Sequence, residues 1–409
     1  MKKLLLVLAI FGLAVSVYAS GKTDTGGTVV NFYGHSDNDP ILKEMIAAFE
    51  KTDPGFKVEY HSIPNDDYDD KIRVLTAGSS DIDALWIRTP AQAQQYITNK
   101  ALLDLTPFIN ESKVNTAPIK NALTGAARDG KIYGLPTTGS CWMTFYNKDL
   151  FDAKGLPYPI DLTWDEYLDL AKKLTYTENG VKYWGGACPP WSLNLGSAAG
   201  NEYLTASEPT PLTRRYAQVL HRMYIDDKSH PSIEDMSVGS FDIMALFDSG
   251  TVYMMIMGDW EFNLFKGNFN LGVAPMPILS GMEKGSSVGQ ASYYCISPKS
   301  KHAKEAYQFI EWATTTAGGT TVYANQKQVP SYSTPESLAA YKKLVTVDGV
   351  DYRFSSKILP EQGPEPYYGQ INDEAYIPEM QLYLLGEQTL DQAFNNFYKL
   401  RAEIIAKNK

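Results

Sequence analysis

Cysteine and histidine are scarce in this sequence of 409 residues, and their spacing excludes two kinds of site. The 3 cysteines are Cys141, Cys188 and Cys295, and they form no C-x-x-C pair. An odd number leaves at least one thiol free, while the other two either pair or stay reduced. The 5 histidines form neither an H-E-x-x-H motif nor a tight ligand cluster. We therefore expect no metal site and no cofactor.

Long apolar runs are also missing, except at the N-terminus. There the basic residues Lys2 and Lys3 precede an apolar stretch from Leu4 to Val17, which ends in a Val17-Tyr18-Ala19 cleavage motif. A membrane anchor is the alternative, but the stretch is shorter than the ~20 apolar residues that span a bilayer. The pattern predicts a signal peptide over residues 1–19, its removal, and a periplasmic or other extracytoplasmic location.

An excess of positive charge is absent as well. The formal net charge is −10, and loss of the signal peptide would take it to about −12, which argues against nucleic acid or an anionic membrane surface as a partner. The remaining chain of about 390 residues is long enough for two domains, each with its own core.

From Thr28 onward, strands and helices alternate. Apolar strands are predicted at 29–32, 56–60 and 82–87, and a helix that begins at Asp39 carries an apolar stripe. This alternation predicts an α/β fold with a parallel sheet, whose ligands bind beyond the carboxyl ends of the strands. The residues at two of those ends are His35, Ser36 and Asp37, then Trp86, Arg88 and Thr89.

Helices and strands are also predicted in the rest of the chain, which contains neither an internal repeat nor a low-complexity linker. Thr163 to Glu166 forms a capping box at the start of a helix. Further helices are expected at 212–225, 241–249, 302–315 and from 372 onward, and further strands at 252–257, 271–275 and 293–297. We expect the domains to be joined by several short crossings.

Several segments, in this order, resemble a series found in extracellular solute-binding proteins. They are Asp129–Pro136, Tyr146–Phe151, Thr163–Glu166, Phe247–Trp260, "LGVAPMPI" at 271–278 and "LLGEQTLDQAF" at 384–394. These proteins are the capture subunits of ATP-binding-cassette (ABC) importers, and the resemblance is to the carbohydrate-binding group that contains maltose-binding protein.

The resemblance implies a two-lobed periplasmic binding protein fold, with three hinge crossings and a ligand cleft between the lobes. The crossings would lie at 137–141, near 272–277 and near 317–332. The first lobe would then comprise 20–138 plus 276–318, and the second lobe 139–275 plus 319–409. A monomer that passes its ligand to the transmembrane permease is implied as well.

Candidate ligand contacts follow from the way in which sugars are recognised, by aromatic faces and by polar groups in a cleft. Trp260 either stacks on a sugar or packs in the core. Asp259 either accepts from hydroxyl groups or caps the next helix. Trp191 contacts ligand or packs in its loop, where the family's pattern of acid, proline and aromatic is replaced by Pro189-Pro190-Trp191.

Arg88 either donates to the ligand or forms a salt bridge between the lobes. Trp164, Trp184 and Trp312 are assigned to the cores. The full set of predicted contacts is His35, Ser36, Asp37, Trp86, Arg88, Thr89, Ser140, Trp191, Asp259, Trp260, Gln290, Tyr332 and Tyr368.

Together these features predict a non-enzymatic binding subunit for a sugar or oligosaccharide. A polyol, a sugar phosphate or another polar solute is the alternative ligand, although no basic cluster at the strand ends suits a multiply charged anion. A secreted glycoside hydrolase is a further alternative, since it also needs a sugar cleft and two carboxylates. No metal-site motif supports an enzyme.

Overall fold

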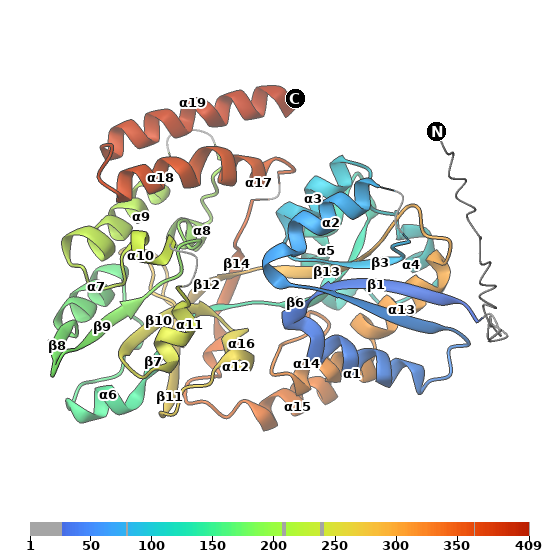
Figure 1. The fold of residues 1–409 in the computed structure, drawn as a ribbon, viewed down its shortest axis with the longest axis horizontal. Coiled ribbons are helices and arrows are strands. Elements are labelled where there is room, and N and C mark those ends of the chain that lie inside the picture. Colours follow the sequence, from blue (N-terminus) through green and yellow to red (C-terminus); the bar gives the residue numbers. More distant parts are fainter. Residues whose placement is uncertain (1–26, 79–80, 207–209, 238–240, 364, 409) are drawn as a thin grey trace, which may run out of the picture.

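The computed structural model describes residues 27–78, 81–206, 210–237, 241–363 and 365–408. The predicted signal peptide at 1–19 lies outside the described residues. Within the described ranges, no helix is both long enough and apolar enough to cross a membrane. Two lobes lie side by side, each with a sheet covered by helices (Figure 1).

The first lobe is built on a five-stranded sheet in the order β2-β1-β3-β13-β6. The three strands from the N-terminal part are parallel, as predicted, whereas β13 runs antiparallel to both of its neighbours. The strands are β1 (Val29–His35), β2 (Lys57–Ile63), β3 (Ala84–Ile87), β6 (Gly134–Gly139) and β13 (Ala291–Ile296).

Helices cover this sheet through their apolar faces. In the helix at Asp39, the buried residues Leu42, Met45 and Phe49 form the predicted stripe, because they recur at helical spacing. The main helices are α1 (Asp39–Glu50), α2 (Tyr68–Ala77), α3 (Pro90–Thr98), α4 (Thr106–Ser112), α5 (Lys120–Leu123), α13 (Ala303–Thr315) and α14 (Ala317–Asn325).

The second lobe has its own five-stranded sheet, in the order β11-β7-β10-β9-β8. Its central strand β10 is buried along its whole length, which explains its continuous apolar sequence. The strands are β7 (Trp142–Asn147), β8 (Tyr176–Glu178), β9 (Val181–Ala187), β10 (Val252–Gly258) and β11 (Leu271–Pro275). A separate parallel pair joins β12 (Ser286–Gly289) to β14 (Lys357–Pro360).

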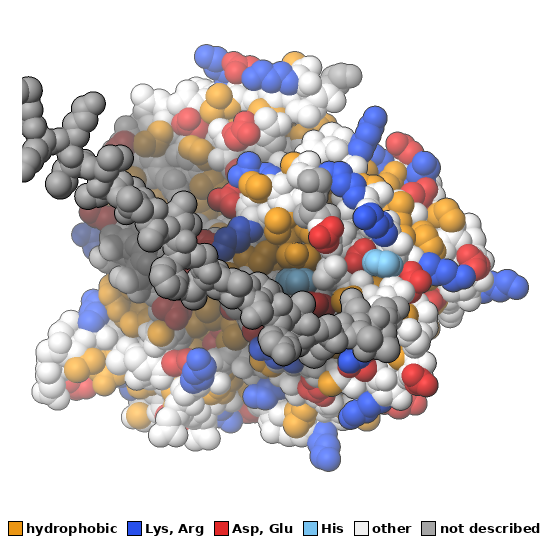
Figure 2. All heavy atoms as spheres, turned by 45° about the vertical axis from the view of Figure 1, so that its right-hand side comes forward, with side chains coloured by type: hydrophobic (Ala, Val, Ile, Leu, Met, Phe, Trp, Pro, Cys, Tyr) orange, Lys and Arg blue, Asp and Glu red, His pale blue; other side chains and the backbone are white. Residues whose placement is uncertain are grey.

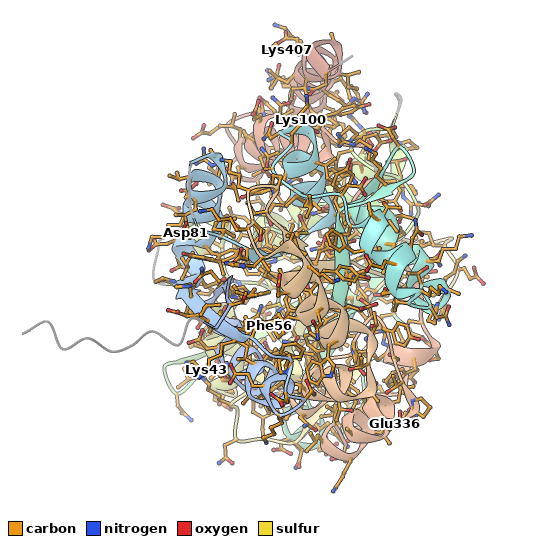
Figure 3. All side chains as sticks on the ribbon, turned by 90° about the vertical axis from the view of Figure 1, so that its right-hand side faces the viewer. Lys43, Phe56, Asp81, Lys100, Glu336 and Lys407 are labelled. Atoms are coloured by element: carbon orange, nitrogen blue, oxygen red, sulfur yellow. The ribbon has the colours of Figure 1, made fainter. Side chains whose placement is uncertain are left out.

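Helix α7 (Trp164–Lys173) begins with the predicted capping box, in which Thr163 and Glu166 each satisfy the other's backbone N–H. The C-terminal helices pack on the second lobe, and Figure 3 shows Lys407 of α19 and Glu336 of α15 at opposite ends of the molecule. The remaining helices are α6 (Lys148–Ala153), α8 (Leu195–Ala198), α9 (Pro211–His221), α10 (Ile233–Ser237), α11 (Ile243–Asp248), α12 (Glu261–Leu264), α15 (Pro335–Leu344), α16 (Tyr352–Ser355), α17 (Tyr368–Ile371), α18 (Ile377–Leu384) and α19 (Leu390–Asn408).

The chain crosses between the lobes three times, and the second crossing lies later in the sequence than the predicted 272–277. The first follows β6. The second lies at 289–291, because Met276, Leu279 and Val288 pack in the core of the second lobe. The third follows α14, whose Val322 and Tyr323 still pack in the core of the first lobe. Strand β11 and residues 276–289 therefore belong with the second lobe, and α14 with the first.

The three crossings are hydrogen-bonded to one another. The Ser140 N–H donates to the Gln290 carbonyl at 2.9 Å, and the Gly139 N–H donates to the Val329 carbonyl at 3.1 Å. The Ser331 N–H also donates to the Thr137 carbonyl at 2.9 Å. The crossings thus form one bundle beneath the space between the lobes.

A buried ion pair holds this bundle to the second lobe. Asp259 and Arg353 are each only 7% exposed, and the Arg353 guanidinium donates through Nε to the Asp259 carboxylate. Arg353 Nη2 also donates to the Gly139 carbonyl at 2.5 Å, and the Cys141 N–H donates to Asp259 Oδ1 at 3.1 Å. The pair therefore joins the end of β10, α16 and the first crossing.

Removal of Arg353 alone should be strongly destabilising. Arg353→Met leaves the Asp259 carboxylate buried without its partner, which typically costs about 3–5 kcal/mol in the free energy of unfolding. The double variant Arg353→Met/Asp259→Leu should recover much of that loss. Urea denaturation measures both, with Arg73→Met, which removes an exposed pair with Asp70, as the matched control. Equal effects of Arg353→Met and Arg73→Met would contradict this role.

Candidate ligand-binding cleft

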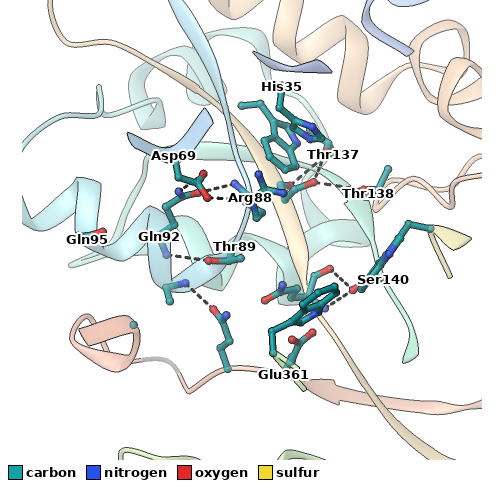
Figure 4. A pocket seen from close by; sticks show the side chains of 18 of the residues that line it. His35, Asp69, Arg88, Thr89, Gln92, Gln95, Thr137, Thr138, Ser140 and Glu361 are labelled. Atoms are coloured by element: carbon teal, nitrogen blue, oxygen red, sulfur yellow. Dashed lines mark hydrogen bonds and ion pairs between the residues drawn. The ribbon is translucent and has the colours of Figure 1, made fainter. Parts of the chain in front are cut away.

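A cavity of about 1140 Å³ lies between the two lobes. Its lining comes from the carboxyl ends of β1 and β3, from the crossings, from the turn after β10, and from the segment that follows β14. Figure 4 shows His35, Arg88, Ser140 and Glu361 around it. Both lobes therefore present side chains to the same space.

Most of the predicted contact residues lie around this cavity. The lining includes His35, Asp37, Trp86, Arg88, Thr89, Ser140, Trp191, Asp259, Trp260, Gln290 and Tyr368. Ser36 and Tyr332 are not part of it. The Ser36 hydroxyl accepts from the Asn65 N–H at 3.1 Å, and Tyr332 packs against the core of the first lobe. Contact between the lining residues and a ligand stays a prediction.

At the end of the cavity that lies in the first lobe, two aromatic rings and a guanidinium group pack together. The His35 ring lies 4.3 Å from the Trp86 ring, and the Arg88 guanidinium carbon lies 5.2 Å from the centre of the Trp86 ring. His35 is 5% exposed, and its Nδ1 has no hydrogen-bond partner. Burial, helped by the nearby Arg88 charge, lowers the pKa of His35 to about 3. His35 is therefore neutral at physiological pH.

Arg88 and Thr89 have partners within the first lobe. Arg88 Nη2 donates to Asn65 Oδ1 at 3.0 Å, and its Nε lies 3.4 Å from Asp69 Oδ2. This ion pair is not between lobes, unlike the predicted alternative. The Thr89 hydroxyl accepts from the Gln92 N–H at 3.1 Å and so caps α3.

Ser140 and Gln290 connect two crossings at the floor of the cavity. The Ser140 hydroxyl donates to the Gln290 carbonyl at 3.1 Å and accepts from the Gln290 N–H at 3.0 Å. The side-chain oxygen of Gln290, Oε1, is buried without a partner. A buried acceptor without a donor is costly, so a ligand that donates to it would be favoured.

Trp260 packs against its neighbours and also lines the cavity, and stacking on a sugar stays a prediction. A Cβ on Gly258 would lie 1.9 Å from a carbon of the Trp260 ring, so the ring occupies the space that glycine leaves free. The ring also meets Trp142 edge-on, at 5.4 Å between centres and 83° between planes. Trp191, in contrast, is 53% exposed at the cavity margin.

Asp259 and Tyr368 are engaged by the protein itself. The Asp259 carboxylate accepts from Arg353 and from the Cys141 N–H, so its predicted alternative role as a side-chain helix cap is not observed. The hydroxyl of Tyr368 accepts from Asn194 Nδ2 at 2.6 Å. Both residues line the cavity, but their polar groups already have protein partners.

Glu361 is a cavity residue that was not predicted from the sequence. Its Oε2 accepts from Trp142 Nε1 at 2.9 Å, and burial raises the pKa of its carboxyl group to about 7. Glu361 follows Pro360 at the end of β14, and the parallel pairing of β14 with β12 places it there. Because that pairing joins distant segments, no local pattern in the sequence pointed to Glu361.

The two lobes, the three crossings and the cavity between them define the architecture of a two-lobed solute-binding protein. The sequence matches the family "Bacterial extracellular solute-binding protein" over residues 34–320. The chain belongs to that family. Membership confirms the family resemblance seen in the sequence and the predicted α/β two-lobed fold.

Individual relatives are distant but cover most of the chain. The sequence is 26% identical over 329 residues to a multiple sugar-binding protein of Streptococcus mutans, with 73% of each chain covered. It is 23% identical over 406 residues to a galactooligosaccharide-binding protein of Bacillus subtilis, covering 92% of this chain and 90% of that one.

A solved structure has the same fold. It is an ABC substrate-binding protein from Listeria monocytogenes in complex with cycloalternan, with a TM-score of 0.82 and 24% sequence identity. The similarity covers 93% of this chain and 99% of that chain.

Acid should destabilise the protein partly through His35. His35 takes up a proton near pH 6.5 in the unfolded state, but only near pH 3 in the folded state. The free energy of unfolding therefore falls as the pH drops between these values. Between pH 7 and pH 5 the loss from His35 should be about 2 kcal/mol. His35→Asn should lose that much less than the wild type in urea titrations. If the free energy of unfolding fell equally with pH in both proteins, this role of His35 would be contradicted. Buried His230 also destabilises the fold in acid, but it does so equally in both proteins and does not affect the comparison.

Proposed function

We propose that the protein binds a sugar or an oligosaccharide between its lobes and delivers it to the permease of an ABC importer. The observation that carries this proposal is the cavity of about 1140 Å³, lined by aromatic and polar side chains of both lobes. Its volume exceeds the roughly 300–1,000 Å³ of typical small-molecule sites, which leaves room for more than one sugar ring. The names of the relatives support the same ligand class.

Aromatic faces and hydrogen-bonding groups in this cavity suit a pyranose ring. Trp260 presents part of an indole that is already fixed against Gly258 and Trp142, so little conformational freedom is lost on binding. Trp191 supplies an exposed indole at the margin. Arg88 retains donors that can reach ligand hydroxyl groups.

Closure of the lobes is the proposed mechanism of capture. Contacts from both lobes to one ligand exist together only when the lobes are close, so ligand favours the closed arrangement. Three crossings restrict the relative motion to a hinge, a known repertoire of periplasmic binding proteins. The ion pair of Asp259 with Arg353 keeps the first crossing attached to the second lobe during that motion.

The protein family and the reported relatives are binding proteins. We extend this to the chain itself and propose that it releases its ligand unchanged, after export through a signal peptide at 1–19 and as a monomer. Nucleic acid is not a proposed partner, because Figure 2 shows basic and acidic side chains interspersed over the visible face.

A sugar phosphate or another anion fits the cavity less well than a neutral sugar. The lining arginines, Arg73 and Arg88, are each paired with an aspartate. A phosphate would therefore find no unpaired cation among the described lining residues.

Loss of an exposed indole should weaken binding without unfolding the protein. Trp191→Ala should raise the dissociation constant of a bound saccharide by about 10- to 150-fold, equivalent to about 1.5–3 kcal/mol of lost aromatic contact. Its melting temperature should stay close to that of the wild type, because Trp191 is 53% exposed. Calorimetric titration and a melting curve measure the two quantities.

Trp184→Ala is the matched control, since Trp184 stacks with Lys182 on β9 and does not line the cavity. This variant should bind saccharide as the wild type does. Unchanged affinity in folded Trp191→Ala would remove Trp191 from the site.

Ligand should also make the molecule more compact. Small-angle scattering at saturating saccharide should give a smaller radius of gyration than scattering without it, because the lobes approach each other. An unchanged profile, with binding verified by calorimetry on the same sample, would rule out closure while leaving binding intact.

A further inference from the structure

The charges around the cavity are unbalanced. The basic side chains among the described lining residues are Arg73 and Arg88, and both are already paired. Arg73 Nη2 lies 2.7 Å from Asp70 Oδ1, and Arg88 Nε lies 3.4 Å from Asp69 Oδ2. His35 adds no positive charge, because it is neutral.

Four lining carboxyl groups have no such cationic partner among the described residues, namely those of Asp37, Glu361, Asp373 and Glu374. The nearest basic atom to Asp37 is Nδ1 of neutral His35, at 3.9 Å. Asp373 accepts from the Asn372 amide at 2.8 Å, and Glu374 accepts from the Gln370 amide at 3.0 Å. The cavity therefore has a surplus of negative charge and of acceptors.

Glu361 occupies the most enclosed position of the four. Its Oε2 accepts from the buried Trp142 indole, which itself meets Trp260 edge-on. Within the described part of the chain, its Oε1 has no hydrogen bond. Figure 4 shows Glu361 at one end of the pocket and His35 at the other.

Two further polar atoms at the cavity lack partners. His35 is more than nine-tenths buried and its Nδ1 is unpaired, and the acceptor Oε1 of Gln290 is also buried and unpaired. Gln290 Oε1 requires a donor, and Glu361 Oε1 is free to accept from one. An ammonium group supplies three N–H donors and no acceptor, whereas a phosphate or carboxylate supplies only acceptors.

We infer that the ligand of this cleft is a saccharide that carries a protonated amine, and that Glu361 holds the ammonium group. This inference rests on the proposed sugar-binding function and specifies its ligand class. The ammonium compensates the surplus charge, and Trp260, which packs edge-on against the buried Trp142, supports the sugar ring.

Proton release should accompany binding. Burial raises the pKa of Glu361 to about 7, and the Trp142 N–H from β7 only partly opposes this shift. The hydroxyl of Tyr368, from α17, is the other titratable group that senses Glu361. Because an ammonium favours the ionised carboxylate, it lowers the pKa of Glu361. Affinity for an amino saccharide should therefore fall as pH drops from 7 to 5, where Glu361 is protonated.

The test is calorimetric titration with matched probes: short oligomers of glucosamine, of glucose and of glucuronic acid, each with α and β linkages. At pH 7 the glucosamine oligomers should bind about tenfold tighter than the glucose oligomers, and the acidic oligomers should bind weakest. At pH 5 the glucosamine oligomers should bind about tenfold more weakly than at pH 7, while the glucose oligomers should change little.

Glu361→Gln removes the charge but keeps an oxygen for the Trp142 N–H. It should lose both the preference for amines and the pH dependence, and it should still bind glucose oligomers. Glu336→Gln, on the exposed surface of α15 in Figure 3, makes the same change in net charge and should behave as the wild type does.

The outcomes separate the two proposals. Equal or tighter binding of glucose oligomers by the wild type at pH 7 overturns the amine inference and leaves sugar binding standing. An amine preference that survives in Glu361→Gln overturns the assignment to Glu361. Failure of all the saccharides to bind folded wild type overturns the proposed function as well. Should Glu361→Gln not fold, the pH profile of the wild type for the three probe classes decides the inference.

Discussion

The arrangement of the lobes depends on one buried ion pair, that of Asp259 with Arg353. Asp259 ends the central strand of the second lobe, and Arg353 reaches across to the carbonyl of Gly139 at the first crossing. Two buried charges are stable only with close partners, so each constrains the position of the other. The same aspartate lies immediately before Trp260. The ion pair thus connects the first crossing to the segment that carries Trp260.

Residues around the cavity divide into those occupied by the protein and those left with free groups. Thr89 caps a helix, Asp259 neutralises Arg353, and the hydroxyl of Tyr368 accepts from Asn194. Trp191 and Glu361, in contrast, keep an indole face and a carboxylate oxygen available. Recognition in this cleft therefore falls to residues with free groups, such as Trp191 and Glu361, while Thr89, Asp259 and Tyr368 stabilise the structure around them.

Local patterns in the sequence predicted the helices and strands well, because neighbouring residues largely determine where a helix or strand forms. The capping box of α7 and the apolar stripe of α1 are examples. The lobe boundaries were less predictable, since residues 276–289 join the second lobe through contacts with segments distant in the sequence. Glu361 and Arg353 carry no local signal at all. Their partners, Trp142 and Asp259, are 219 and 94 positions away in the sequence.

Neither lobe is a continuous piece of chain, and this affects how the protein acquires its structure. Strand β13 completes the first sheet, yet it is synthesised after every strand of the second sheet, and its neighbouring crossing joins residues 150 positions apart. Contacts between such distant residues form slowly, because a long loop must close first. A newly made chain would consequently remain unfolded for longer than one built from local contacts. Slow folding of that kind would suit the proposed export of the chain before it folds.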